Sequence, residues 1–484
     1  MEWDKLLTDD RFELDLSRNN NGPKRNVTDL KGGYITTFQD DIERITYCSS
    51  FRRLQGKTQV HPLPANDYVR NRLTHSYETS YVGRVLGTAI GRWLEQSKHI
   101  DHKVHDPSDI GDIVAAACLA HDLGNPPFGH IGEFAIRSWF LEHAPKSGQS
   151  GNSKKHFSFV TEALSADNTA GDFLTFDGNA QGFRIITKLQ NWRSKGGLRL
   201  TYAVLGAFTK YPFSSSVAES INYSGKFGFF RSDVSGFRSV AQKTGLTPKK
   251  IPAITPIVNQ DEYWARHPLA YLVEAADDIC YRTTDIEDGV KAGIVSEAKG
   301  MELLNSISQK KYKTRIDDIP SEAVFDKIAY IRSAAISTLM DDAIEVFVNK
   351  YDPIMRGNFS GSLLEGGSFN SNLKNIAEFS KKTLYTARSK VEVEVAGYRV
   401  IHGIMEEFAD VFEGIKMWGE DGLNMRQRAV CALLPTEIKS RLNKDPTDLC
   451  MNLIDYVSGM TDQYAVRLYQ QLSGVRVGGR AYTA

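Results

Sequence analysis

The sequence predicts a mostly α fold, and three observations support this prediction. Residues 38–54 place Ile45 and Phe51, among other apolar residues, at spacings that fit one face of a helix. Residues 113–119 are apolar, rich in alanine and free of glycine and proline, as expected for a buried helix. Residues 391–395 alternate apolar and acidic side chains and could pass for a strand, but no other segment offers them a convincing partner.

The predicted elements follow one another along the chain without an internal repeat. Residues 1–35 are polar with a loop at 19–22, and residues 55–71 connect helices at 38–54 and about 72–96. Further helices are predicted from 107 to 121, over 178–190 and over about 269–281. The Gly/Ser-rich segment 144–156 and the aromatic-rich segment 213–237 are predicted loops. From about residue 311, helical stretches alternate with Gly-rich breaks such as 357–372.

Size and composition narrow the class of protein. At 484 residues the chain can bury a sizeable core, and 59 basic side chains balance 59 acidic ones. The net charge of zero gives no global reason to expect nucleic acid or an anionic membrane as a partner. Five scattered cysteines without C-x-x-C spacing indicate a reducing compartment and argue against a thiolate zinc site. Because the sequence shows neither a signal peptide nor a stretch of about 18 apolar residues, we expect a cytoplasmic protein without a membrane span.

The segment 119–133 organises the predicted functional site. His121 and Asp122 stand at the end of an apolar helix, where two buried polar side chains need partners. Glycines and prolines at 124–129 then break the helix. His130 and Glu133 follow three residues apart, at the start of the next predicted helix. Two histidine–carboxylate pairs on either side of a turn indicate a site rather than a core.

These residues first suggest a divalent metal. With His75 and Asp277, the His121–Asp122 pair would supply two imidazoles and two carboxylates, each on a helix. Such ligands suit a divalent cation from Mg²⁺ and Mn²⁺ to Zn²⁺, and an octahedral ion would keep room for water and a substrate oxygen. Taken singly, His75 also fits a surface or capping histidine. His121 and Asp122 alone also fit a hydrogen-bonded pair at a helix end.

Several long motifs give the chain a resemblance to a known family. They are residues 51–60 (FRRLQGKTQV), 72–76 (RLTHS), 119–130 (LAHDLGNPPFGH), 178–184 (GNAQGFR), 206–212 (GAFTKYP), 274–281 (EAADDICY) and 458–464 (SGMTDQY). With these motifs in this order, the chain resembles the HD-domain phosphohydrolases. More closely, it is similar to the bacterial dGTPase-like deoxynucleoside triphosphate triphosphohydrolases. The resemblance covers nearly the whole chain.

The resemblance implies a domain organisation and a reaction. Residues 1–310 would form an HD-domain helical core with an N-terminal extension, and 311–484 a helical C-terminal region packed on it, unless the two are one continuous domain. The implied reaction is hydrolysis of a dNTP, dGTP being favoured, to deoxynucleoside and inorganic triphosphate. Water attacks the α-phosphorus in this reaction.

By the same resemblance, the metal ligands are His75, His121, Asp122 and Asp277, and the cofactor is a divalent metal, first of all Mn²⁺ or Mg²⁺. His130 would act as the general acid or the general base. Glu133 lies one helical turn further on and would orient the His130 imidazole. A structural histidine in a tight turn is the alternative for His130.

A triphosphate carries about four negative charges, so cations must converge on it. Arg72 lies three residues before His75 on the same helical face and is expected to reach the α-phosphate. The resemblance adds Lys210, Tyr211 and Lys226 as phosphate contacts. A solvated surface position is the alternative for each lysine.

Selection of a deoxyribose needs a close fit at C2′ and a hydrogen bond to the 3′-hydroxyl. Tyr281 and Asp285 follow Asp277 by four and eight residues and so share one helical face. The resemblance places Tyr281 beneath the ribose and gives Asp285 and Gln59 the 3′-hydroxyl, whereas Tyr281 alone is most simply a core aromatic. Asp278 is expected to point away from that face and either to support the metal ligands from behind or to pair with a cation.

Two other functions stay open from the sequence. One is an HD-domain phosphohydrolase that acts on other nucleotides, and the other is a nucleotide-sensing or nucleic-acid-binding HD protein without turnover. Basic residues between Arg426 and Lys444 could bind single-stranded DNA or line an exposed helix face. The family forms ring-like homohexamers or related oligomers, with nucleotide effectors in some members, so we expect a homo-oligomer.

Overall fold

Helices build the part of the chain that the computed structural model describes. These residues are 1–13, 35–60, 69–145, 156–166, 169–193, 197–221, 223, 225–251, 262–308, 319–320 and 323–475. Among them no strand forms, and extended segments pair only in isolated bridges such as Arg11 with Thr201. The mostly α prediction is therefore confirmed. None of the helices in these ranges combines the length and the apolar character that crossing a bilayer requires.

The helices of the first 308 residues surround the site described below. They are α1 (Trp3–Leu6), α2 (Thr37–Tyr47), α3 (Ser49–Arg53), η2 (Leu54–Gly56), α4 (Arg72–Gln96), α5 (Pro107–Ala120), α6 (His130–Glu142), α7 (Ser158–Ser165), α8 (Ala170–Leu174), α9 (Gly178–Arg184), the π-helical turn η3 (Ile185–Leu189), α10 (Tyr202–Phe208), α11 (Ser215–Ser220), η4 (Arg231–Asp233), α12 (Val234–Thr244), α13 (Pro268–Lys291) and α14 (Glu297–Asn305).

The later helices are fewer and longer. They are α15 (Val324–Asn349), α16 (Tyr351–Met355), α17 (Asn370–Thr383), α18 (Arg388–Trp418), η7 (Glu420–Gly422), α19 (Met425–Ala432), α20 (Thr436–Lys439), α21 (Pro446–Ser458) and α22 (Asp462–Leu472).

Capping residues explain where the helices that carry the site begin. Asn71 forms a capping box with Thr74, so α4 starts at the predicted residue. Asp106 accepts from the Ser108 N–H, and Pro107 occupies the first turn of α5, where no backbone donor is needed. The helix predicted over 269–281 is present but longer, because α13 extends to Lys291.

Two expectations from the sequence are wrong. The helix predicted over 38–54 is interrupted at Cys48, which is extended and accepts from the Phe51 N–H to start α3. The segment 213–237 is not one long loop, because it contains α11, η4 and the start of α12. Residues 391–395, for which the sequence offered no convincing strand partner, lie inside α18, in agreement with the mostly α prediction. The predicted loop at 19–22, the prolines of 61–68, most of 144–156 and the tail after 475 lie outside the described residues.

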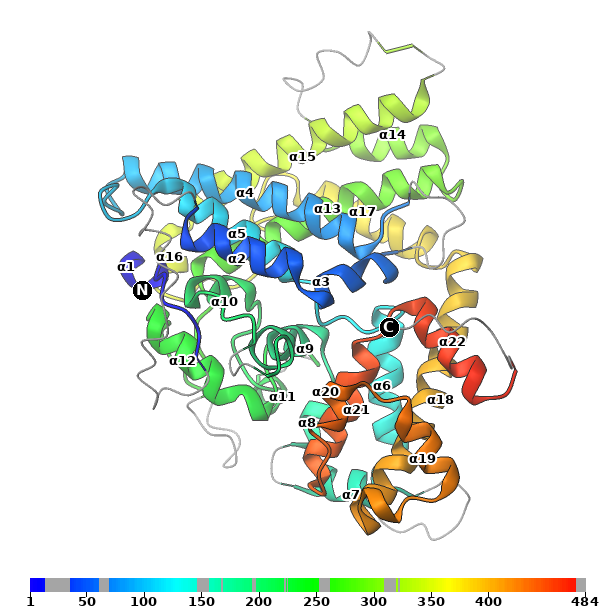
Figure 1. The fold of residues 1–484 in the computed structure, drawn as a ribbon. Coiled ribbons are helices and arrows are strands. Elements are labelled where there is room, and N and C mark those ends of the chain that lie inside the picture. The colour runs from blue at the N-terminus through cyan, green and yellow to red at the C-terminus, as the bar shows by residue number, and fades with distance from the viewer. Residues whose placement is uncertain are drawn as a thin grey trace.

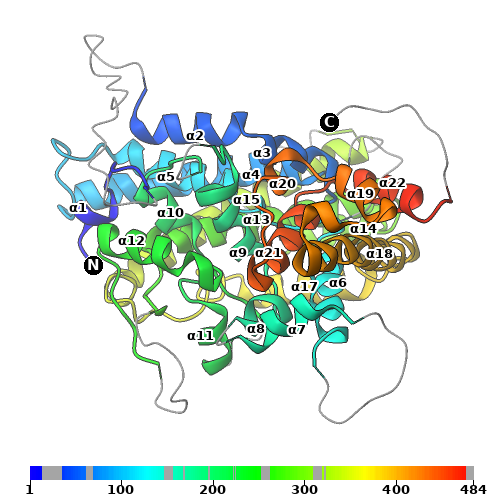
Figure 2. The same ribbon diagram turned by 60° about the horizontal axis from the view of Figure 1, so that its bottom comes forward.

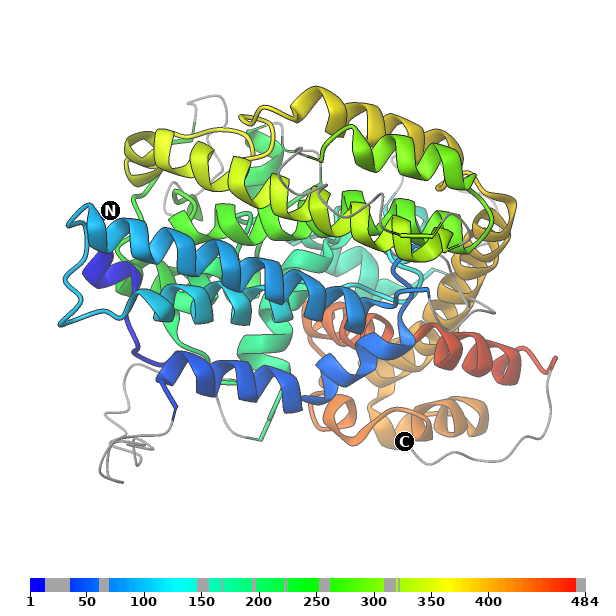
Figure 3. The same ribbon diagram turned by 90° about the horizontal axis from the view of Figure 1, so that it is seen from above.

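The first hydrophobic core lies among α2, α4, α5, α10, α13 and α15. It includes fully buried side chains such as Leu86, Ile113, Leu272 and Leu339. Figure 3 shows α4, α13 and α15 side by side in blue, green and yellow-green, and the contacts between these helices agree with that view. This layer carries three of the segments that form the site.

The second hydrophobic core joins segments that are far apart in the sequence. In Figure 1, α6 and α7 lie beside α18 and α21, and Figure 2 shows α7, α8 and α11 gathered at the same end of the molecule. Trp139 and Phe159 pack in this core with Phe408 and Leu453. The helices after residue 310 divide between the two cores, because α17 packs with the first core and residues after 400 pack with the second. The domain boundary proposed near residue 310 stays a prediction.

Candidate active site

One cavity of about 540 Å³ gathers most of the predicted site residues. Its walls come from α4, α6, α10, α13 and α18 and from the turn that follows α5. The predicted residues on these walls are Gln59, Arg72, His121, Asp122, His130, Glu133, Lys210, Tyr211, Lys226, Asp277 and Tyr281. His75 and Asp285 are buried behind the walls.

His75, His121 and Asp277 form the centre of the site. His75 Nε2 lies 3.0 Å from Asp277 Oδ1, and His121 Nε2 lies 3.5 Å from the same oxygen. His121 Nδ1 is 2.7 Å from the Cys118 carbonyl oxygen, which can only accept, so Nδ1 carries a proton and Nε2 faces Asp277. The donor atoms of the three residues all lie within 4.8 Å of one another. Two imidazoles and a carboxylate at this spacing fit a divalent cation.

The electrostatics of this centre favour a cation. Although burial opposes it, the charges of Asp122 and Asp277 raise the pKa of His121 to about 9. Against the same effect of burial, His121 and His75 hold the pKa of Asp277 well below its usual range. Asp122 and Asp277 thus favour positive charge beside the point where the three donor atoms meet.

Asp122 lies beside this centre but is engaged elsewhere. Its Oδ2 accepts from Arg72 Nη1 at 2.8 Å, its Oδ1 accepts from the Asn125 amide, and His121 Nε2 is 3.6 Å from Oδ1. The Arg72 guanidinium in turn passes close to Gly129, where an added Cβ would lie 2.8 Å from Nη2. Arg72 is thus fixed between Asp122 and the turn that precedes α6, at the wall of the cavity.

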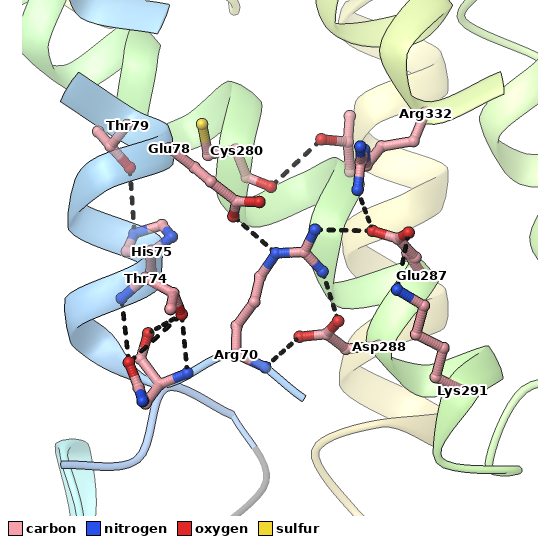
Figure 4. A network of polar contacts seen from close by, with 12 residues as sticks. Arg70, Thr74, His75, Glu78, Thr79, Cys280, Glu287, Asp288, Lys291 and Arg332 are labelled. Atoms are coloured by element: carbon pink, nitrogen blue, oxygen red, sulfur yellow. Dashed lines mark hydrogen bonds and ion pairs between the residues drawn. The ribbon is translucent and has the colours of Figure 1, made fainter. Parts of the chain in front are cut away.

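A network of ion pairs around Arg70 joins the start of α4 to α13 (Figure 4). The Arg70 guanidinium lies 2.6 Å from Glu78 Oε2, 2.8 Å from Glu287 Oε2 and 2.5 Å from Asp288 Oδ1. Arg332 of α15 also pairs with Glu287. Because α4 carries one histidine of the centre and α13 carries its aspartate, these contacts fix the two helices at the spacing that the site needs.

Replacing Arg70 by Met is expected to destabilise the fold by about 3 to 5 kcal/mol, because it leaves the nearly fully buried Asp288 carboxylate without a cation. Urea unfolding measures the change. The matched control is Arg426→Met, which removes an ion pair with Glu407 whose arginine side chain is 64% exposed and which is expected to cost about 1 kcal/mol or less. Equal losses in both variants would contradict the prediction.

His130 and Glu133 form the second group of the site, on the first turn of α6. The His130 side chain is 91% exposed at the cavity, and its Nδ1 lies 3.5 Å from Glu133 Oε2. Glu133 is buried and accepts from the Gly178 N–H at 2.9 Å, with Arg137 and Lys226 each 3.6 Å from Oε2. Although burial opposes it, the hydrogen bond with His130 and the Lys226 charge lower the pKa of Glu133 to about 2. Glu133 is therefore an anion that can orient the imidazole.

The other cations at the cavity each have an acidic neighbour. Lys210 Nζ lies 3.2 Å from Glu274 Oε1 and 5.6 Å from the centre of the Tyr211 ring. Although burial opposes it, Glu274 raises the pKa of Lys210 above its usual value. Lys226 Nζ lies 3.7 Å from Asp177 Oδ1 and 3.6 Å from Glu133 Oε2. Acidic neighbours therefore hold both lysines at the cavity wall, rather than leaving them on a free surface.

Tyr281 and Asp285, which are expected to contact the nucleoside, lie together with Tyr385, a residue that the sequence did not predict at the site. The Tyr281 and Tyr385 rings stack with centres 6.3 Å apart, and their hydroxyls are hydrogen-bonded. The Tyr385 hydroxyl also donates to Asp285 Oδ2 at 2.9 Å, and burial raises the pKa of Asp285 to about 8. Tyr385 thus stands between Asp285 and the cavity. Gln59 lines the cavity, and its buried Oε1 has no hydrogen-bond partner among the described residues.

Sequence reasoning missed the wall that comes from the C-terminal region. Tyr385, Lys390, Val393 and Glu394 line the cavity, and Lys390 and Glu394 form an ion pair of 2.8 Å within α18. The spacing of four between these two charges is a helix signal by which the sequence could have revealed this wall. Asp278 also lines the cavity, contrary to the expectation that it points away, and burial raises its pKa to about 6.

Comparison with known proteins gives the family. A model of the phosphohydrolase-associated domain family matches residues 368–471. A deoxyguanosinetriphosphate triphosphohydrolase-like protein of Pseudomonas aeruginosa is 34% identical over 483 residues, covering 98% of this chain and 99% of that protein. A protein of the same name from Synechocystis is 34% identical over 481 residues, covering 98% and 100%. The deoxyguanosinetriphosphate triphosphohydrolase of Yersinia pseudotuberculosis is 29% identical over 506 residues, covering 90% and 93%.

The similarity extends over practically the full length of both chains, so the site described above lies within the matched region. This chain belongs to the dGTPase-like family of HD-domain triphosphohydrolases, which confirms the resemblance inferred from the motifs.

Proposed function

We propose that this protein hydrolyses deoxynucleoside triphosphates, dGTP first among them, to the deoxynucleoside and inorganic triphosphate. Water attacks the α-phosphorus and the nucleoside O5′ leaves. The observation that carries the proposal is one cavity where His121 and Asp277, with His75 buried behind them, share the walls with the His130–Glu133 pair. The Yersinia pseudotuberculosis relative, whose name specifies dGTP and release of triphosphate, matches 90% of this chain.

A divalent cation, for which we propose Mn²⁺ or Mg²⁺, would be held by His75, His121 and Asp277, with Asp122 beside them. When bound, it supplies Lewis acidity toward a phosphate oxygen and toward water. The side chains contribute the proton transfers and the binding. Glu133 accepts from His130 Nδ1 and so leaves Nε2 to take a proton from water or to give one to O5′.

The remaining residues would hold the two ends of the nucleotide. Arg72, Lys210 and Lys226 supply positive charge for the phosphates, and Tyr211 lies beside them. Tyr281 offers a flat surface for the ribose at the wall formed by α13. Gln59 has a buried amide oxygen that can accept from the 3′-hydroxyl. In the arrangement seen here, Asp285 reaches the substrate through Tyr385 or after its displacement.

The test is a product assay with each dNTP and GTP offered separately in the presence of Mn²⁺ or Mg²⁺. Deoxynucleoside and triphosphate in equal amounts are expected, with dGTP hydrolysed fastest. Release of pyrophosphate or orthophosphate would indicate another HD-domain phosphohydrolase. Absence of any turnover, alone or in nucleotide mixtures, would leave the nucleotide-sensing function as the better explanation.

The oligomeric state and the cellular compartment of this protein are also proposals. We propose a homo-oligomer in the cytoplasm, on the family resemblance, with nucleotides or single-stranded DNA as candidate effectors. Light scattering gives the mass in solution. Turnover that appears only in mixtures of dNTPs would indicate that a second nucleotide must bind before the site is active.

A further inference from the structure

Asp462, the first residue of α22, reaches from the C-terminal region to two segments beside the cavity. Its carboxylate is buried and accepts three hydrogen bonds. Oδ2 accepts from the Thr58 N–H at 3.0 Å and from the Thr58 hydroxyl at 2.6 Å, and Oδ1 accepts from the Phe128 N–H at 3.0 Å. One side chain therefore joins the segment after η2 to the turn before α6.

The turn before α6 has a backbone conformation that needs support. Phe128 has a φ of 62°, and Gly129 follows with 60°, so two left-handed residues directly precede His130. This conformation costs a residue with a Cβ about 1 to 2 kcal/mol. The Phe128 ring is also held by α18, because a Cβ on Gly397 would lie 2.7 Å from its Cγ. The C-terminal region thus contacts both the backbone and the ring of the residue that sets the start of α6.

The segment after η2 is tied to the same place. Thr58 directly precedes Gln59, which lines the cavity. Lys57 is buried, and its Nζ donates to the carbonyl oxygens of Asn125 at 2.5 Å and Ser458 at 2.8 Å. These bonds hold this segment, the turn and the end of α21 together, so a shift of α22 would move both walls of the cavity.

We propose that Asp462 is a positioning residue for the reaction and that through it the C-terminal region sets the geometry of the active site. Its carboxylate fixes Gln59 and the turn from Phe128 to His130 relative to each other. The inference rests on the proposed function, because the reaction that it serves is dNTP hydrolysis. A misplacement of reacting groups by about 1 Å can cost about 10²-fold in rate.

The test compares Asp462→Asn with a matched control, Glu413→Gln. An asparagine has one acceptor and one donor group, so it cannot serve the Phe128 N–H and the Thr58 donors together. Glu413 also accepts from a hydroxyl and a backbone N–H, those of Ser158 at 2.6 Å and Phe159 at 3.2 Å. Those partners belong to the start of α7, which does not line the cavity.

For Asp462→Asn we expect kcat to fall about 30- to 100-fold, with a much smaller change in KM, and for Glu413→Gln we expect wild-type kcat. Hydrogen exchange provides a readout that does not depend on turnover. The amides of residues 126–133 should exchange at least about tenfold faster in Asp462→Asn and at the wild-type rate in Glu413→Gln. If Asp462→Asn does not fold, Thr58→Val removes one of the three bonds and should lower kcat about tenfold.

A folded Asp462→Asn protein with kcat within twofold of wild type would overturn the proposal. A loss of kcat in the Glu413→Gln control equal to that in Asp462→Asn would also overturn the proposal. If the wild-type protein releases triphosphate from no dNTP, the proposed function fails, and the exchange rates alone then decide whether Asp462 positions the turn. Unchanged exchange at 126–133 in Asp462→Asn would overturn that role.

Discussion

The Asp277→Ala protein is expected to lose triphosphate release by about 10³-fold or more, which corresponds to about 4 kcal/mol of transition-state stabilisation. Asp277 Oδ1 is the atom that both histidines of the centre approach, at 3.0 and 3.5 Å. The Asp277→Ala change removes the carboxylate that attracts a cation to the point between the two histidines. Metal content by elemental analysis after gel filtration should fall together with activity.

The control for Asp277→Ala is Asp278→Asn, a change at the next residue of the same helix. Asp278 lines the cavity but does not belong to the three residues whose donor atoms converge. The metal content of the Asp278→Asn protein is therefore expected to equal that of the wild-type protein. Retention of bound metal and of activity in Asp277→Ala would contradict the proposed metal centre.

The His130→Ala protein is expected to lose about 10² to 10⁴-fold in kcat, the usual contribution of a general acid or base. His130 is oriented by Glu133 but lies largely exposed at the cavity, so its loss should leave stability and metal content unchanged. Steady-state kinetics and elemental analysis measure the two effects. Partial recovery of kcat with added imidazole would support a proton-transfer role.

His102 provides the comparison for His130, because its side chain is also exposed, at 63%, and lies on a surface away from the cavity. His102→Ala should retain wild-type kcat and KM. If His130→Ala were as active as His102→Ala, proton transfer in this protein would have to come from another group.

Local patterns in the sequence were sufficient for much of the fold. Start signals such as Asn71 before α4 and Pro107 in α5 act within a few residues, so the helices that they begin were predicted well. The Leu119–Glu133 segment was predicted to be a site because its polar residues and helix breakers are adjacent. The interruption at Cys48 was missed because a single extended residue leaves the apolar spacing around it almost unchanged.

Contacts between distant segments could not be predicted in the same way. Tyr385 stands between Asp285 and the cavity, and Lys390 and Glu394 complete a wall, because α18 packs across the earlier helices. Lys210 and Lys226 were predicted as phosphate contacts from the resemblance, with a surface position as the alternative, and only the folded chain places Glu274 and Glu133 beside them. No local pattern encodes such neighbours.

The sequence by itself determined which side chains of this protein can do chemistry and on which helices they lie, because ligand type, helix spacing and capping are local properties. The tertiary structure alone decided how they meet. His75 and His121 converge on Asp277 because α4, α5 and α13 pack around one core, and the turn before His130 is held by Asp462 from the far end of the chain. Packing brings these groups together, and their burial and close contacts shift their pKa values. Packing itself depends on contacts along the whole chain.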